Sequence, residues 1–368
     1  MTQAPDARAV PDRPAPPLDL CDSAILKAVG IIAIVLHNYY HHLPGAAVQN
    51  EFGWVRGRFA EALIQASNPR HFIQASFSYF GHYGVQLFIF LSAYGLALRY
   101  WEAGDRRDFF RSRIAKLYPT FALAFGLYLL LKLIQDGPDG LIAFLGRHGG
   151  ELLLTALGVL TLVPHHDLPP VGPWWFLPFI MQFYLVWPWL AELARRRGPT
   201  GLLALSALAI GVLSWNQSPL GINLLMLPVG HLPELSLGIA YARFGARVTP
   251  SIGLVSLVVF LLGNLIGPLW YFTPVTALVV MLWAYGWVAP TLRRSRSLRL
   301  IGEISMPMFF LNGYLRGLFW GIGRSKVWYV QVGGGLATLG LTVMVGYGIW
   351  RLERRLMARP QPVPAQAV

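Results

Sequence analysis

The sequence of residues 26–42 is LKAVGIIAIVLHNYYHH, and this stretch decides how the rest of the chain is interpreted. Apart from Lys27, its first eleven residues carry no polar side chain. With its neighbours it is long enough for a helix over 23–42 to cross about 30 Å of hydrocarbon. His37 follows Lys27 by ten positions, about 15 Å along a helix axis. Because a titratable side chain at this depth is costly, His37 is a candidate site residue.

Apolar runs of similar length recur along the chain. They cover 79–100, 110–134, 174–194, 200–215, 222–242, 251–268, 272–290, 302–321 and 328–350. The whole chain is 55% hydrophobic and 13% charged, against about 25% charged in a typical soluble domain. This composition excludes an ordinary soluble enzyme and a disordered or fibrous protein. We therefore predict an all-α, polytopic membrane protein with about ten transmembrane helices.

The chain ends and the single cysteine complete the predicted organisation. Residues 1–20 and 357–368 are polar and rich in proline and alanine, and we expect two disordered cytoplasmic tails around one integral-membrane domain over 21–356. The first apolar run has no small-residue cleavage site after it, so we predict no signal peptide. Cys21 alone excludes a disulfide framework within the chain and a cysteine-based metal cluster.

The basic residues predict which side of the membrane each connection occupies. The net charge is +13, from 30 Lys+Arg and 17 Asp+Glu. The clusters follow every second span, at 106–116, 195–197, 243–247, 293–299 and 351–359. An excess of Lys and Arg marks the cytoplasmic side, so both termini are expected in the cytoplasm. The alternation holds only if 140–163, which is interrupted by RHGGE, is a re-entrant or interfacial helix. Orientation also explains most of the charge, and nucleic-acid binding is not expected.

His37 is the strongest candidate for chemistry. Neutral imidazole accepts a proton near physiological pH, so a histidine inside a span is a natural general base. His41 lies on the same helix face at i+4, although it and His42 also suit the outer headgroup zone. A metal site needs three or four ligands, and no matching histidine or carboxylate pair occurs in another span. We therefore predict no bound metal.

Two further groups of polar residues lie in or beside the spans. Arg111, Arg113 and Lys116 enter the third span, where they can grip phosphate oxygens or simply anchor the helix at the interface. Glu234 lies within the sixth span. Glu303 opens the ninth span and also fits an ordinary helix start. Asn312 and Arg316 lie deeper in that span.

These segments, taken in order, resemble the type 3 acyltransferase family of membrane O-acyltransferases. Lys27 and His37 are similar to its basic-residue-to-histidine pair, with Lys in place of the commoner Arg and nine intervening residues in place of ten. The other similar segments are Gly84 to Tyr94, Phe110 to Pro119, Trp174 to Leu177 with the later Tyr184 and Pro188, and Gly302 to Asn312, where the family commonly has His at the position of Asn312.

The resemblance implies transfer of an acyl group, most often acetyl, from cytoplasmic acetyl-CoA to a sugar hydroxyl of an exopolysaccharide or other cell-surface glycan. His37 would be the general base, with Glu303 and Glu234 as further catalytic candidates. Lys27, Arg111, Arg113 and Lys116 would hold the CoA phosphates. Trp175, Tyr184 and Asn312 would contact a glycan or lipid-linked oligosaccharide acceptor, although Trp175 and Tyr184 also fit an interfacial aromatic belt.

The implied location is the bacterial cytoplasmic (inner) membrane, with acetyl-CoA as a co-substrate and no permanently bound cofactor. The alternative is a transporter or flippase for lipid-linked glycans. It would use Glu234 and His37 as a proton relay without acyl-transfer chemistry.

Overall fold

The computed structural model describes residues 17–102, 104–166 and 168–357; most of the two predicted tails, 1–16 and 358–368, lies outside these residues. The described residues form helices and connections, and their one β-bridge pairs Asn50 with Gly53. The helices are α1 Leu20–Tyr40, α2 Arg58–Ser67, α3 Phe72–Phe80, α4 Gly84–Arg99, α5 Arg106–Ala156, α6 Phe176–Trp215, α7 Leu232–Arg243, α8 Pro250–Leu265, α9 Thr273–Leu292, α10 Arg296–Glu303, α11 Ser305–Leu315, α12 Trp320–Gly323 and α13 Trp328–Met357. The predicted all-α class is confirmed.

Six helical segments of the described residues are long and apolar enough to cross a membrane. They are Leu20–Tyr40, Phe72–Arg99, Arg106–Ala156, Gly172–Trp215, Gly267–Leu292 and Trp328–Met357, and α8 is a shorter apolar helix. A chain with this many apolar helices is a multi-pass membrane protein.

Two predicted spans are not continuous helices. In 222–242 the regular helix α7 begins only at Leu232, because the chain before it forms short 3-10 turns at Leu224–Met226 and Pro228–His231, and Pro228 has no N–H to donate. In 302–321 the regular α-helix is interrupted at Ile304 and ends again at Arg316. This leaves α11 with 11 residues. Each helix is therefore shorter than a full crossing needs.

α5 and α6 each contain a sharp reversal at a Gly-Pro pair. Gly137 has φ 72° and Gly198 has φ 61°, and a proline follows each of them. In α5, Tyr128 packs on Phe144, so the second half runs back along the first. In α6, both Trp175 before the helix and Gln217 after it contact Phe52, so this helix also doubles back. The first reversal separates 110–134 from the predicted re-entrant segment, and the second separates 174–194 from 200–215.

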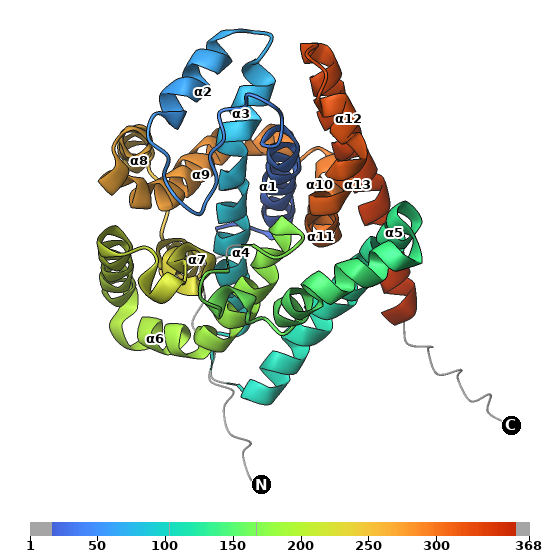
Figure 1. Cartoon of the computed structure of the whole chain (residues 1–368). Helices are drawn as coiled ribbons and strands as arrows, with labels where there is room; N and C mark the ends of the chain where they lie inside the picture. The colour runs from blue at the N-terminus through green and yellow to red at the C-terminus, as the bar shows by residue number, and fades with distance from the viewer. Residues whose placement is uncertain (1–16, 103, 167, 358–368) are drawn as a thin grey trace, which may run out of the picture.

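α1 and α4 lie in the middle of the molecule, between α8 and α9 on one side and α13 on the other (Figure 1). α1 is buried along much of its length. α10 crosses it closely at Gly302, which has no side chain. A Cβ added there would lie 1.9 Å from the carbonyl oxygen of Ala24. α1 therefore connects two ends of the fold. Its N-terminal end lies beside α10, and its C-terminal end lies beside the connection 41–57.

Candidate active site

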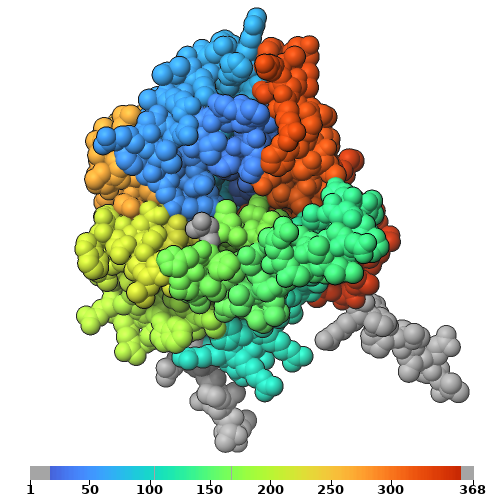
Figure 2. All heavy atoms as spheres, in the orientation of Figure 1, coloured from blue at the N-terminus to red at the C-terminus, as the bar shows by residue number. Residues whose placement is uncertain are grey.

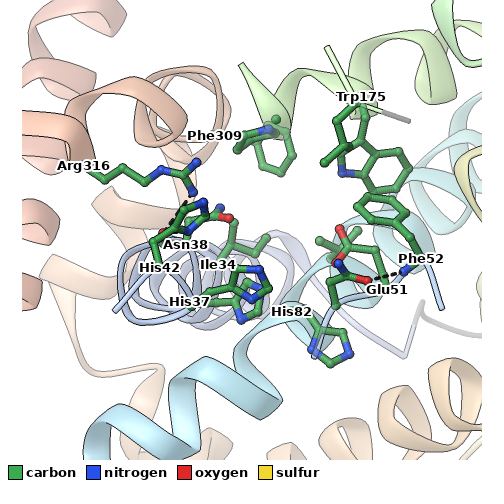
Figure 3. Close-up of a pocket in the computed structure, with 16 residues that line it drawn as sticks. Ile34, His37, Asn38, His42, Glu51, Phe52, His82, Trp175, Phe309 and Arg316 are labelled. Atoms are coloured by element: carbon green, nitrogen blue, oxygen red, sulfur yellow. Dashed lines mark hydrogen bonds between the residues drawn. The ribbon is translucent and has the colours of Figure 1, made fainter. Parts of the chain in front are cut away.

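A cavity of about 140 Å³ lies at the C-terminal end of α1. Its polar lining residues are His37, Asn38, His41, His42, Asn50, Glu51, His82 and Arg316, and its apolar ones are Ile34, Phe52, Val85, Leu168, Gly172, Pro173, Trp175 and Phe309. Asn38, His42 and Arg316 lie on one side and Glu51, Phe52 and Trp175 on the other (Figure 3). In Figure 2 the surface is recessed where the blue segment after α1 meets the green and red-orange segments.

His37 is held in one orientation and one tautomer. A Cβ added to Gly81 would lie 2.6 Å from the Cβ of His37, so only glycine lets α1 and the end of α3 approach this closely. The Nδ1 atom of His37 lies 3.1 Å from the carbonyl oxygen of Phe77. Because a carbonyl only accepts hydrogen bonds, Nδ1 carries the proton and Nε2 carries the lone pair. The ring therefore presents a base to the cavity.

Three further imidazoles surround His37. The ring centroids of His41 and His82 lie 4.8 and 5.5 Å from that of His37, and His42 lies 5.1 Å from His41. Both ring nitrogens of His82 are buried with no hydrogen-bond partner among the described residues. Despite this cluster, the described residues include no group of three or more His, Cys, Asp or Glu side chains arranged to hold a metal ion.

Glu51 faces this cluster from the connection between α1 and α2, outside the candidate spans. Burial raises the pKa of its carboxyl group from the ordinary 4.5 to about 7, although the backbone of Glu51 itself, the charge of His231 and a hydrogen bond with Trp175 act in the opposite direction. Near neutral pH the carboxyl group is therefore partly protonated, and it can donate as well as accept a hydrogen bond.

Replacing Glu51 by glutamine should flatten the dependence of stability on pH. Because the pKa of Glu51 is higher in the folded state than in the unfolded state, its protonated form stabilises the fold. This contribution to the free energy of unfolding is complete below pH 4.5. It is lost, by about 3 kcal/mol, as the pH rises through 7. The unfolding temperature of Glu51→Gln in detergent should therefore fall less than that of the unchanged protein between pH 5 and 8. The matched control is Glu61→Gln, whose carboxylate is partly exposed beside Arg58. Equal slopes for all three proteins would show that Glu51 ionises normally.

Asn312 lies behind the cavity wall rather than in it. Its side chain is fully buried, its Oδ1 accepts a hydrogen bond from Nδ2 of Asn38 at 2.7 Å, and its own Nδ2 donates to the carbonyl oxygen of Phe309 at 2.6 Å. The carbonyl oxygen of Asn38 in turn accepts from Nη1 of Arg316 at 2.9 Å. Asn312 therefore fixes the residue that orients Arg316.

Trp175 lines the cavity, and Glu234 lies behind it. The ring of His231 stacks on Trp175, with centroids 6.2 Å apart. Nε2 of His231 donates to the carbonyl oxygen of Leu225 at 2.9 Å, so Nδ1 is left to accept. Oε1 of Glu234 is 3.6 Å from that Nδ1, and neither carboxyl oxygen has a hydrogen-bond partner among the described residues. The pair is buried beside the cavity but does not line it.

The basic candidates gather near the other end of α1. The charge of Lys116 acts on Lys27, and the charges of Arg113 and Arg99 act on Lys116. Nη2 of Arg113 donates to the hydroxyl of Tyr100 at 2.8 Å, and its guanidinium lies 4.8 Å from the centre of that ring. The structure thus brings Lys27, Arg113 and Lys116 together.

Arg111, Tyr184 and Glu303 lie apart from the positions expected for them. Arg111 is exposed and lies about 160° around α5 from Arg113, at 100° per residue. Tyr184 is within electrostatic reach of Arg113, so it is beside the basic cluster rather than beside Trp175. Glu303 is exposed and next in the chain to Gly302, which contacts Ala24, thirteen residues or about 20 Å along α1 from His37. The structure does not bring Glu303 to the cavity.

Sequence reasoning did not assign a role to three cavity residues, Glu51, His82 and Arg316. Glu51 lies in a connecting segment outside the apolar stretches, whereas His82 lies near the start of the predicted span 79–100, where a polar side chain was itself a signal. A signal for Arg316 was present, because it is charged and lies within a predicted span. Its partner Asn38 directly follows His37 in the chain.

The fold and the cavity together define a multi-pass membrane protein with a base-bearing, histidine-lined pocket between its helices. Comparison with known protein families matches residues 23–347 to the acyltransferase domain of the acyltransferase 3 family. The chain belongs to this family, and it is an enzyme that transfers acyl groups. No curated protein and no solved structure matches it.

Proposed function

We propose that this acyltransferase moves an acetyl group from acetyl-CoA to a sugar hydroxyl of a cell-surface glycan, with His37 as the general base. The observation that carries the proposal is the hydrogen bond from Nδ1 of His37 to Phe77, which leaves Nε2 free in a polar cavity. A sugar hydroxyl is a weak nucleophile, and removing its proton during attack is the step that a positioned imidazole accelerates.

The proposed reaction needs no chemical group beyond the two substrates and the imidazole of His37. The hydroxyl oxygen bonds to the carbonyl carbon of the thioester while Nε2 of His37 takes the hydroxyl proton. The carbon–sulfur bond then breaks, and the departing CoA thiolate takes the proton from Nε2 of His37. The products are the acetylated sugar and free CoA, and the imidazole is neutral again.

The size of the cavity supports a small acyl group together with the part of a sugar ring that carries the reacting hydroxyl. A cavity of about 150 Å³ accommodates one benzene-sized molecule, and this cavity measures about 140 Å³. Trp175 and Phe52, which pack edge to face at 5.1 Å, provide an aromatic wall for the ring. The remainder of an oligosaccharide or a lipid-linked acceptor would extend outside the cavity.

The basic cluster supports a CoA donor. Arg113, Lys116 and Lys27 present positive charge where α5 begins, and Arg and Lys side chains bind phosphate groups in proteins. Lys27 and His37 are about 15 Å apart along α1. We therefore propose that the CoA phosphates bind at this cluster and that the extended arm of CoA carries the thioester toward His37.

We further propose ten membrane crossings, with both termini in the cytoplasm of a bacterium and the enzyme in its inner membrane. The reversal at Gly198 supports the count, because it separates two crossings, and the segment 138–156 after Gly137 is proposed to re-enter without crossing. α7 and α11 would cross together with the irregular segments beside them, which lie against other helices.

Reporter fusions should confirm this topology. Fusions after Arg197, Arg247 and Arg299 should report the cytoplasm, and fusions at Asn50 and Gly323 should report the opposite side, because the basic clusters follow alternate spans. The measurement is a pair of reporters active on opposite sides of the membrane. An external signal after Arg197 would mean that 138–156 crosses fully, and the ten-span topology would be wrong.

The function itself is tested in two assays. Purified enzyme in detergent should bind acetyl-CoA, and the cell-surface glycans of a strain that lacks the gene should lose O-acetyl groups that a plasmid copy restores. An unchanged glycan O-acetyl content, with the protein confirmed in the parent strain, would rule out the proposed acceptor class.

A further inference from the structure

We propose that Arg316 binds an anionic group of the acceptor, so that the enzyme selects a sugar that carries a carboxylate or a phosphate near the hydroxyl to be acylated. This inference rests on the proposed function, because it concerns the acceptor in the same cavity. Arg316 lines the main cavity and also a small adjoining one of about 10 Å³, and His42 lines both. The guanidinium is therefore at the junction between the two spaces.

Among the described residues, no carboxylate forms an ion pair with Arg316. Within the described part of the chain, the carboxylate that lines the cavity is that of Glu51, and it lies on the opposite side from Arg316 (Figure 3). A partly buried cation without a counter-charge is unfavourable, and an anionic ligand relieves that cost.

The guanidinium is also held ready to bind. Within the described part of the chain its hydrogen bond is the one from Nη1 to the carbonyl oxygen of Asn38. That leaves most of its five N–H donors for a ligand, in the planar arrangement that grips a carboxylate or phosphate through two oxygens. Asn38 is itself fixed by Asn312, so Arg316 is oriented before any ligand arrives.

The charge of Arg316 reaches both His41 and His42 and opposes a second positive charge on either ring. Nδ1 of His42 donates to the same carbonyl oxygen of Asn38 at 3.1 Å, and within the described residues Nε2 of that ring is left to accept. Because that Nε2 carries a lone pair, an anion here would be held by the guanidinium of Arg316 rather than by His42. An acceptor sugar held between Arg316 and Trp175 would then extend across the cavity. His37 lines the same cavity.

The test compares three sugars of similar ring size on the purified full-length protein: methyl α-glucoside, methyl α-glucuronide and glucose 1-phosphate. Affinity is measured as the shift in unfolding temperature during titration. At least one anionic sugar should bind about tenfold or more tightly than the neutral one, the effect of a charged hydrogen bond. The stronger of the two anionic sugars then identifies the group as a carboxylate or a phosphate.

Variants assign that preference to Arg316. Arg316→Gln should reduce the affinity for the anionic sugar to that for methyl α-glucoside, and Arg316→Lys should keep part of the preference. The matched control is Arg324→Gln, which removes an exposed positive charge from the same end of the molecule. If Arg316→Gln does not fold, as judged by acetyl-CoA binding, the partial loss in Arg316→Lys carries the test.

Three outcomes would overturn the proposal: equal binding of all three sugars, no binding of any of them at millimolar concentration, or an anionic preference that survives in both Arg316 variants. None of these outcomes depends on glycan O-acetylation in cells. The acceptor preference and the acyl-transfer function can therefore fail separately.

Discussion

Replacing His37 by alanine should lower acyl transfer by about 10² to 10⁴-fold, the usual contribution of a positioned general base. The variant loses the Nε2 lone pair that the bond to Phe77 directs into the cavity. It should still insert in the membrane and bind acetyl-CoA, because the basic cluster lies about 15 Å away along α1. The measurement is glycan O-acetyl content in a deletion strain that carries the variant, corrected for protein abundance.

Two further variants separate chemistry from packing at this position. His37→Gln keeps a polar side chain of similar length that can still donate to Phe77 but offers no base, so it should be as inactive as His37→Ala. His41→Ala changes the neighbouring ring, whose centroid is 4.8 Å away, and should reduce transfer much less. Full acetylation with His37→Gln would remove His37 from the mechanism.

Replacing Arg113 by alanine should weaken acetyl-CoA binding by about 10- to 100-fold. An arginine hydrogen-bonded to a phosphate contributes about 1.5–3 kcal/mol, and each 1.4 kcal/mol is a factor of ten. Tyr100 already holds the Arg113 side chain through a 2.8 Å hydrogen bond, so little ordering remains to be done when the donor binds. The dissociation constant of acetyl-CoA for the purified protein is the quantity to measure.

Arg111→Ala is the matched control for Arg113→Ala. The two residues have the same charge and belong to the same turn of α5, but Arg111 lies on the far side of the helix. Its replacement should change the affinity for acetyl-CoA by less than about fivefold, since a solvent-exposed charge contributes about 0–1 kcal/mol. Equal losses in the two variants would indicate general attraction by positive charge rather than a defined phosphate site.

Much of the fold followed from the periodic placement of apolar and basic residues. The long helices, the all-α class and the reversal beside Arg197 are consequences of local composition, which one sequence displays directly. The interruptions at Ile304 and Arg316 were missed, because an apolar run looks continuous even where tertiary packing breaks its helix. Membrane-scale hydrophobicity indicates where a segment lies but not whether its backbone is regular there.

The candidate site was predictable only where one helix carries it. Lys27 and His37 occupy the same helix, so their separation could be calculated from its rise. Glu51 comes close to His37 only because 41–57 folds back over the cavity, and Arg316 only because α11 ends beside α1. Such approaches depend on tertiary structure, which has no periodic signal. The same reason explains why Glu303 was assigned to a site that lies far from it.

The Gly-Pro reversals at 137–138 and 198–199 have a consequence for how this chain tolerates insertions. A loop can absorb an added residue, whereas these reversals join two helices without a loop. One residue added after Gly198 would rotate the following helix by about 100° relative to its current phase. Leu202, Ala209 and Leu213, now buried, would turn toward lipid. Length variation among such enzymes should therefore avoid the two reversals, which act as fixed points that keep each hairpin in phase.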